Sequence, residues 1–116
     1  MEGRFSGGLL YVLANCKDPA KEEDLNNWYN ETHFPDMITS GIFTRALRFR
    51  NVSPTLDPHE ARYAAFYETE NGDLAEVAQR LDALIGELHQ RGHIHPALDL
   101  IHVALYSGIE SGFQTR

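Results

Sequence analysis

The chain has 116 residues, of which 42% are hydrophobic, and a formal net charge of -7 at pH 7. This length suits one domain with its own core. The acidic balance excludes nonspecific nucleic-acid binding, which requires clustered Lys and Arg. A single cysteine, Cys16, allows no intramolecular disulfide and indicates a reducing, cytoplasmic location. No apolar run in the sequence is long enough to span a membrane.

The first predicted element is a strand over residues 9–15, after a polar tail of residues 1–7. The strand segment is apolar and is bounded by turn-forming residues, which is typical of a buried strand. It also faintly resembles a lipoprotein signal ending at Cys16. That interpretation is weaker, because the basic region is one Arg balanced by Glu2.

A helix is predicted from Pro19 to about His33. Asp18 suits the N-cap and Pro19 suits the first helical position. Because Pro35 pushes the residue before it out of the α region, we expect the regular helix to end or kink near His33 or Phe34. The His33 imidazole would then lie beside unpaired carbonyls at the negative end of the helix dipole, which favours its protonated form.

Two strands are predicted next, over residues 42–52 and 62–69. The segment between them contains Pro54 and Pro58 and is interpreted as a loop. Apolar and polar residues alternate in the strand segments, which is the two-residue period of a strand.

The clearest helix begins after Asp73 and ends at Arg91. Asp73 with Glu76 is an aspartate version of the capping box, and Gly92 suits the position after a helix end. Between them the apolar residues recur at helical spacing. A last strand is predicted over residues 98–107, followed by a tail over residues 108–116.

The order β-α-β-β-α-β predicts an α+β fold of the ferredoxin-like type, an antiparallel four-stranded sheet with both helices on one face. Residues 8–107 would form this single domain. Both alternate sets of residues are apolar on the first and last strands, whereas a sheet face open to water shows polar alternation. We therefore expect a homodimer whose sheets pack face to face, each covering the apolar face of the other.

Residues 28–36, Trp-Tyr-Asn-Glu-Thr-His-Phe-Pro-Asp, resemble the helix motif of the EthD-like members of the dimeric α+β barrel superfamily. Gly41-Ile42-Phe43 and the basic second strand are also similar to that family. The resemblance implies a homodimer with a pocket in each subunit between the sheet and the helices or loops. It implies no single reaction, because the superfamily includes polyketide cyclases, decarboxylases, dehydratases, isomerases, hydroxynitrile lyases, cofactor-free monooxygenases and haem enzymes.

No cofactor is expected. The sequence contains no glycine-rich phosphate loop, so a nucleotide cofactor is disfavoured. His93 and His95 could place two metal ligands on one side of an extended segment, with His89, His102 or His33 as a third, but spacing sets no third ligand. Acid–base chemistry without a cofactor, or plain binding of a small molecule, remains.

His33 is the candidate general acid or base, because the ordinary pKa of histidine lies near working pH. Asp36 could hold its tautomer, and Arg48 could stabilise an enolate or carboxylate. The alternative is structural, with Trp28 and Tyr29 as core residues and His33 as a hydrogen-bonded helix end. The candidate substrate-binding residues share an aromatic side chain: Tyr11, Trp28, Tyr29, Tyr63, Tyr67, His102 and Tyr106.

The function predicted from the sequence is a small cofactor-independent enzyme of the lyase, cyclase or isomerase type. Its substrate would be a hydrophobic oxygenated, aromatic or polyketide-like molecule held in the barrel pocket. Two alternatives stay open, a non-catalytic dimeric protein that binds a small ligand and a cofactor-free monooxygenase. Neither nucleic acid nor a membrane is expected as a partner.

Overall fold

The computed structural model describes residues 7–53, 57 and 60–109. Most of the predicted tails and part of the predicted proline-containing loop lie outside the described residues. Within this part of the chain, no helix is long and apolar enough to cross a membrane. The elements are β1 (Gly8–Cys16), the 3-10 turn η1 (Pro19–Lys21), α1 (Glu22–Trp28), the π-helical turn η2 (Tyr29–His33), α2 (Phe34–Thr39), β2 (Arg45–Arg50), β3 (Tyr63–Thr69), α3 (Leu74–Gln90) and β4 (Leu98–Ser107).

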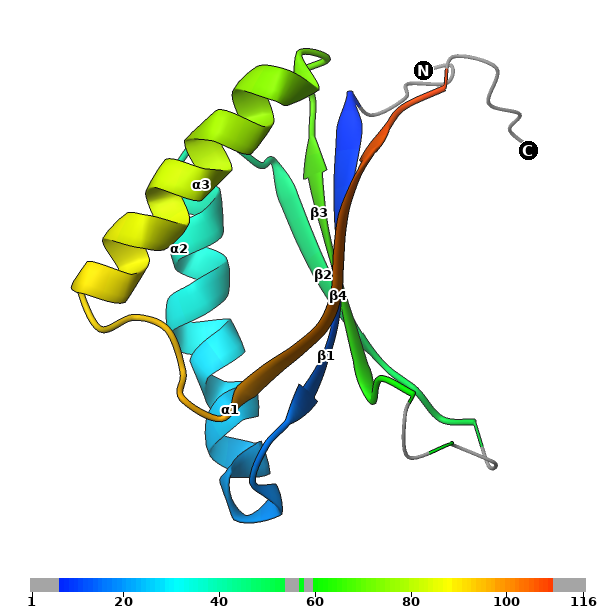
Figure 1. The fold of residues 1–116 in the computed structure, drawn as a ribbon, viewed down its shortest axis with the longest axis vertical. Helices are drawn as coiled ribbons and strands as arrows, with labels where there is room; N and C mark the ends of the chain where they lie inside the picture. The colour runs from blue at the N-terminus through cyan, green and yellow to red at the C-terminus, as the bar shows by residue number, and fades with distance from the viewer. Residues whose placement is uncertain (1–6, 54–56, 58–59, 110–116) are drawn as a thin grey trace.

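The four strands form one antiparallel sheet in the order β2-β3-β1-β4. All the helices lie on one side of this sheet, and the other side carries no helix (Figure 1). This is the α+β arrangement that the sequence predicts. The helix caps are also as predicted, since the side chain of Asp18 accepts from the Ala20 amide and that of Asp73 accepts from the Glu76 amide. Gly41 and Gly92 end their helices at positive φ, which glycine adopts without strain.

The regular α-helix is interrupted near His33, as predicted, but the chain stays helical there instead of leaving the helix. The helix passes through Pro35 and ends at Thr39, and one wide turn makes this possible. In η2 the Phe34 amide donates to the Tyr29 carbonyl five residues back rather than four. A proline ring in a regular helix collides with the carbonyl four residues before it, and a wider turn gives it room. His33 is therefore an interior helical residue, away from the helix dipole's negative end.

The second strand is shorter than predicted, at Arg45–Arg50, because residues 42–44 precede the sheet ladder. β4 has the predicted bounds but contains a bulge. Its register with β1 shifts between Leu13 and Ala14, which pair with His102 and Leu100. The extra residue, Ile101, turns Leu100 to the face that carries Val103 rather than to that of Tyr106.

The core lies between the sheet and the helices. Leu10, Val12, Ala65 and Tyr67 from the central strands pack there against α2, α3 and the residues before β2. The residues between them on the same strands point to the other side, where no element of the described chain covers them. This asymmetry creates one enclosed layer beside the helices and one bare apolar sheet face.

Candidate functional site

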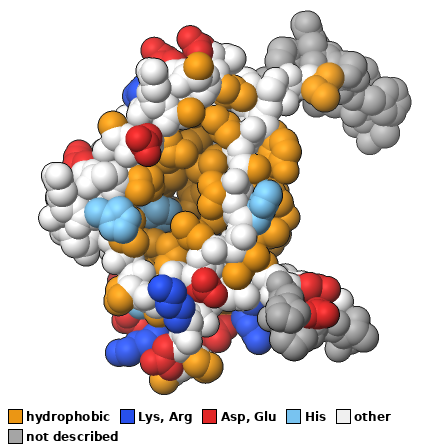
Figure 2. Space-filling view, in the orientation of Figure 1, with side chains coloured by type: hydrophobic (Ala, Val, Ile, Leu, Met, Phe, Trp, Pro, Cys, Tyr) orange, Lys and Arg blue, Asp and Glu red, His pale blue; other side chains and the backbone are white. Residues whose placement is uncertain are grey.

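An apolar cavity of about 160 Å³ lies between the sheet and the helices. In space-filling view it is a hollow whose walls are mostly hydrophobic, open between the helices and the sheet (Figure 2). Most of its lining is aliphatic. Only four lining side chains carry a polar group, which is a tyrosine hydroxyl or the ring nitrogens of a histidine. Those four residues are Tyr29, His33, Tyr67 and His89.

His33 is the buried imidazole of this cavity, with 7% of its surface exposed. Its ring stacks on the Trp28 indole, with centroids 4.6 Å apart and planes 16° apart. The rings of Tyr29 and Tyr67 meet it edge-on, at 5.5 and 6.0 Å. Its Nδ1 is buried and has no hydrogen-bond partner among the described residues. An orphaned buried polar atom costs stability, and the residue that carries this one lines the cavity.

Burial lowers the pKa of His33 from its ordinary value of 6.5 to about 4. Removal from water disfavours the charged imidazolium and is the largest cause. The carboxylate of Asp36 opposes this change, and the guanidinium of Arg48 adds to it. The imidazole is therefore neutral at pH 7 and able to accept a proton, contrary to the charged form that a helix terminus would favour.

Arg48 lies behind the cavity rather than in its wall. Its guanidinium carbon sits 3.8 Å from the centre of the Tyr29 ring and 4.3 Å from that of the Tyr63 ring. Nη1 donates to the Asn26 side chain, and Nε and Nη2 are buried without a partner among the described residues. Burial raises the pKa of both Tyr29 and Tyr67, and Arg48 acts against this by favouring their anionic forms. Its positive charge thus acts on the ionisable groups of the cavity, His33, Tyr29 and Tyr67, although Arg48 does not line it.

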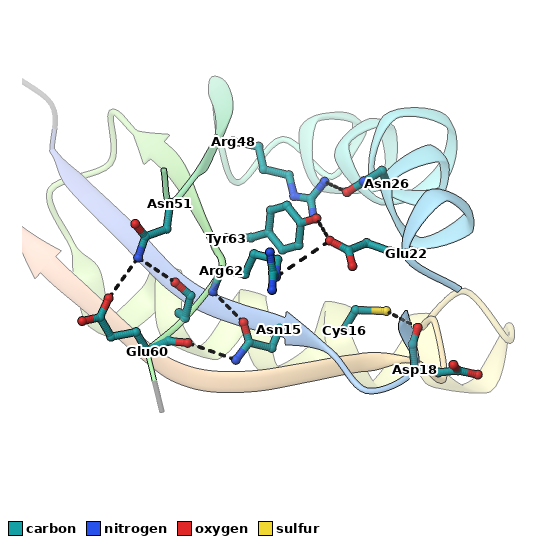
Figure 3. A network of polar contacts seen from close by, with 11 residues as sticks. Asn15, Cys16, Asp18, Glu22, Asn26, Arg48, Asn51, Glu60, Arg62 and Tyr63 are labelled. Atoms are coloured by element: carbon teal, nitrogen blue, oxygen red, sulfur yellow. Dashed lines mark hydrogen bonds and ion pairs between the residues drawn. The ribbon is translucent and has the colours of Figure 1, made fainter. Parts of the chain in front are cut away.

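A polar network holds Arg48 in place at the end of the sheet near α1 (Figure 3). The side-chain oxygen of Asn26 in α1 accepts a hydrogen bond from the Arg48 guanidinium. Beside this contact, the Tyr63 hydroxyl donates to the Glu22 carboxylate. The guanidinium of Arg62 lies 3.9 Å from the same carboxylate. Tyr63 therefore supports Arg48 and does not line the cavity.

The sequence predicts that Asp36 orients His33. In the structure Asp36 pairs with His93 instead. Its Oδ2 lies 2.8 Å from Nδ1 of His93, and the Trp28 indole N–H donates to the backbone carbonyl of the same residue. His95 contacts a different carboxylate, with Nε2 at 2.7 Å from Oδ2 of Asp24. Within the described ranges no three side chains of His, Cys, Asp or Glu cluster as metal ligands. The two histidines instead attach residues 91–97 to the first helix.

The predicted site residues divide between the two faces of the sheet. Tyr29, His33 and Tyr67 meet on the cavity, with Trp28 behind His33. Tyr11 and Tyr106 lie on the opposite face with His102, because their strand positions alternate with those that face the helices. Their rings contact one another there, with centroids 6.2 and 6.3 Å from that of Tyr11. These three side chains do not line the cavity.

Most of the lining residues were not assigned to a pocket from the sequence, and His89 and Ile94 are two of them. The sequence indicated His89 only as a possible third metal ligand, and Ile94 lies in the connector between the last predicted helix and the last predicted strand. His89 follows the apolar stripe of α3 at helical spacing, one residue after the buried Leu88, so the period itself was the available signal. No sequence pattern indicated that Ile94 lines the cavity, because its position depends on how the connector before β4 folds over α1.

Comparison with known proteins matches residues 9–90, more than half of the chain, to the family described as "Domain of unknown function (DUF4286)". Over 71 residues the chain is 38% identical to "Core atranone cluster (CAC) protein 1" of Stachybotrys chlorohalonatus (strain IBT 40285), a match that covers 60% of this chain and 28% of that protein. The chain thus spans little more than a quarter of that relative's length.

A solved structure with a similar fold is HapK from Hahella chejuensis, with a TM-score of 0.59 and 10% sequence identity. The alignment covers 94% of this chain and 99% of HapK, so the likeness concerns the whole fold. The kinship with EthD-like proteins stays a prediction from residues 28–36. On the match over residues 9–90, the chain belongs to the DUF4286 family.

Proposed function

We propose that this protein takes part in small-molecule biosynthesis and that His33 transfers a proton on a ligand held in the apolar cavity. The observation that carries the proposal is the buried, neutral imidazole of His33, whose Nδ1 has no partner among the described residues. The similarity to a protein named for the atranone cluster supports a place in secondary metabolism. The enzyme class would be a cofactor-independent lyase, cyclase or isomerase.

In this proposal the ligand is an apolar ring compound with a carbonyl group. The imidazole takes a proton from the carbon next to the carbonyl, so a C–H bond breaks, an N–H bond forms and the electron pair moves into an enolate. The positive charge of Arg48, which already favours the anions of Tyr29 and Tyr67, favours the enolate as well. The imidazolium is costly in this cavity and returns its proton readily. The proton goes to another carbon of the enolate in an isomerisation, or to the alkoxide oxygen formed when the enolate carbon attacks a second carbonyl of the ligand.

The experiment is deuterium exchange into phenylacetone in D₂O, followed by proton NMR. The wild-type protein should accelerate exchange at the carbon between ring and carbonyl. His33→Ala and His33→Asn should lower the rate by roughly a hundredfold or more, the usual scale for one general base. The matched control is His102→Gln, which alters a histidine on the opposite sheet face. Full exchange by the His33→Ala protein would reject the role of His33.

A second candidate function is binding without turnover. A pKa of about 4 makes His33 a weak base at neutral pH, which favours a hydrogen-bonding role over proton abstraction. Under this alternative phenylacetone binds to the wild-type protein, and the rate of exchange equals that in buffer. Titration by NMR and the exchange rate together distinguish the two functions.

We also propose that the bare sheet face is the interface of a homodimer. Tyr11, Phe66, Phe49, His102 and Tyr106 contact one another on that face, and Phe49 is 54% exposed. A continuous aromatic surface of this kind on a soluble domain marks an interaction site, and a second copy of the chain offers a matching surface.

A further inference from the structure

The cavity beside His33 is small for a complete ligand. Its volume of about 160 Å³ matches one benzene-sized ring, since a cavity of about 150 Å³ takes up benzene. Sites for larger small molecules usually have about 300 Å³ or more. A second hollow of about 470 Å³ lies next to it, between η1, α1 and the connector before β4. Ile94 lines both spaces and is the residue that the two linings share.

Ile94 stands between two anchored residues. His93 is held by Asp36 at 2.8 Å and by its own amide, which donates to the Leu88 carbonyl. His95 is held by Asp24 at 2.7 Å, and its Nδ1 accepts from the Ala97 amide. The aliphatic side chain of Ile94 has no polar anchor and is half-buried. A rotation of this one side chain would therefore change both linings while its neighbours hold the backbone in place.

The outer hollow is lined by two lysines and two aspartates, and of these only the aspartates have partners among the described residues. Its two carboxylates are engaged, because Asp24 pairs with His95 and Asp18 accepts from the Ala20 amide. Lys17 and Lys21 also line it, and in the part of the chain that the structure describes neither ammonium group makes an ion pair or hydrogen bond. A carboxylate in the hollow would meet two available cations.

We infer that the outer hollow is the second half of the ligand site and that Ile94 is the partition between the halves. The ring of the ligand lies beside His33, and an acidic tail passes Ile94 to reach Lys17 and Lys21. The inference rests on the proposed function, because it takes the inner cavity as the place of the ring. It identifies the substrate class as an aromatic or ring-containing acid.

The charge test uses three probes, phenol, 4-phenylbutanoic acid and 4-phenylbutanamide, titrated by NMR. The wild-type protein should bind the acid about fivefold more tightly than the amide, the scale of one exposed ion pair. The double variant Lys17→Gln/Lys21→Gln should lose this preference and bind phenol as before. Arg80→Gln removes a charge from α3 outside the hollow and should keep the preference.

The partition test changes Ile94 in both directions. Ile94→Ala should bind 4-phenylbutanoic acid severalfold more tightly, and Ile94→Phe should bind it more weakly, with the affinity for phenol unchanged in both. Thermal melting shows that each variant is folded. Equal binding of acid and amide by the wild-type protein, or an Ile94→Ala variant without effect on the acid, overturns the inference alone. Failure of phenol to bind the wild-type protein rejects the inner cavity and overturns both proposals.

Discussion

His33 shows how the surroundings of one residue determine its chemistry. The helix continues beyond it, so it lacks the unpaired carbonyls that would stabilise its charge, and the nearest carboxylate is directed to His93. The Trp28 indole and the edges of Tyr29 and Tyr67 surround it instead. These contacts exclude water, and the loss of hydration keeps the imidazole neutral.

This burial predicts a loss of stability in acid. The unfolded chain binds a proton at His33 near pH 6.5, whereas the folded chain binds it only near pH 4. The stability linked to neutral His33 is thus present above pH 6.5 and decreases as pH falls towards 4. Between pH 7 and pH 4.5 the loss should be roughly 2–3 kcal/mol from this residue.

The measurement is urea unfolding of the wild-type protein and of His33→Phe at both pH values. Phenylalanine can stack on Trp28 and does not titrate, so the variant should lose less free energy of unfolding than the wild-type protein between pH 7 and pH 4.5. All other titrating groups are common to both chains. The same loss in both proteins would contradict a buried neutral His33.

At the scale of elements, two His–Asp pairs attach the connector between α3 and β4 to the first helical segment. They differ in exposure, because the Asp36 carboxylate is 17% exposed and that of Asp24 is 71% exposed. Water screens an exposed carboxylate and leaves little net energy in its pair. The pair of Asp36 with His93 should therefore contribute most of the attachment.

Double-mutant cycles with alanine test this difference. We expect a coupling free energy of about 1 kcal/mol between Asp36 and His93 and less than about 0.5 kcal/mol between Asp24 and His95. Each cycle is read from the free energy of unfolding at the same pH. A stronger coupling in the Asp24 pair would show that exposure does not decide the strength of these contacts.

At the scale of the whole molecule, the sheet has one face covered by helices and one bare (Figure 1). The aromatic contacts on the bare face join three strands, β1, β2 and β3, and reach β4 through His102 and Tyr106. Burying such a face removes apolar surface from water, which is the main driving force of stable association.

The proposed dimer predicts a mass in solution of twice the 13.1 kDa of the chain by light scattering at micromolar concentration. Phe49→Lys should give the mass of one chain or an unfolded protein, because dimerisation would bury an unpaired charge on each sheet face. Ile38→Lys is the matched control, since Ile38 is 39% exposed on the helical side of the molecule. A wild-type mass of 13.1 kDa would reject the dimer.

The sequence alone determined which elements form and in which order. Local signals carry that information: the two-residue period of the strands, the apolar stripe of α3, the side-chain caps at Asp18 and Asp73 and the glycines after the helices. Their order then leaves few topologies, and the antiparallel sheet with its helices on one face follows. The position of His33 beside an apolar helical face also made it a candidate from the sequence, and in the structure it lines the cavity.

Only the tertiary structure decided which side chains face the cavity and which groups pair. Both faces of the first and last strands are apolar, so alternation could not place Tyr11, His102 and Tyr106 on the bare face. The wide turn before Pro35 carried the helix past the expected break, which removed the terminus that would have charged His33. The pairing of Asp36 with His93 joins residues 57 positions apart, and contacts at such separations depend on the packing of the whole chain rather than on any local pattern.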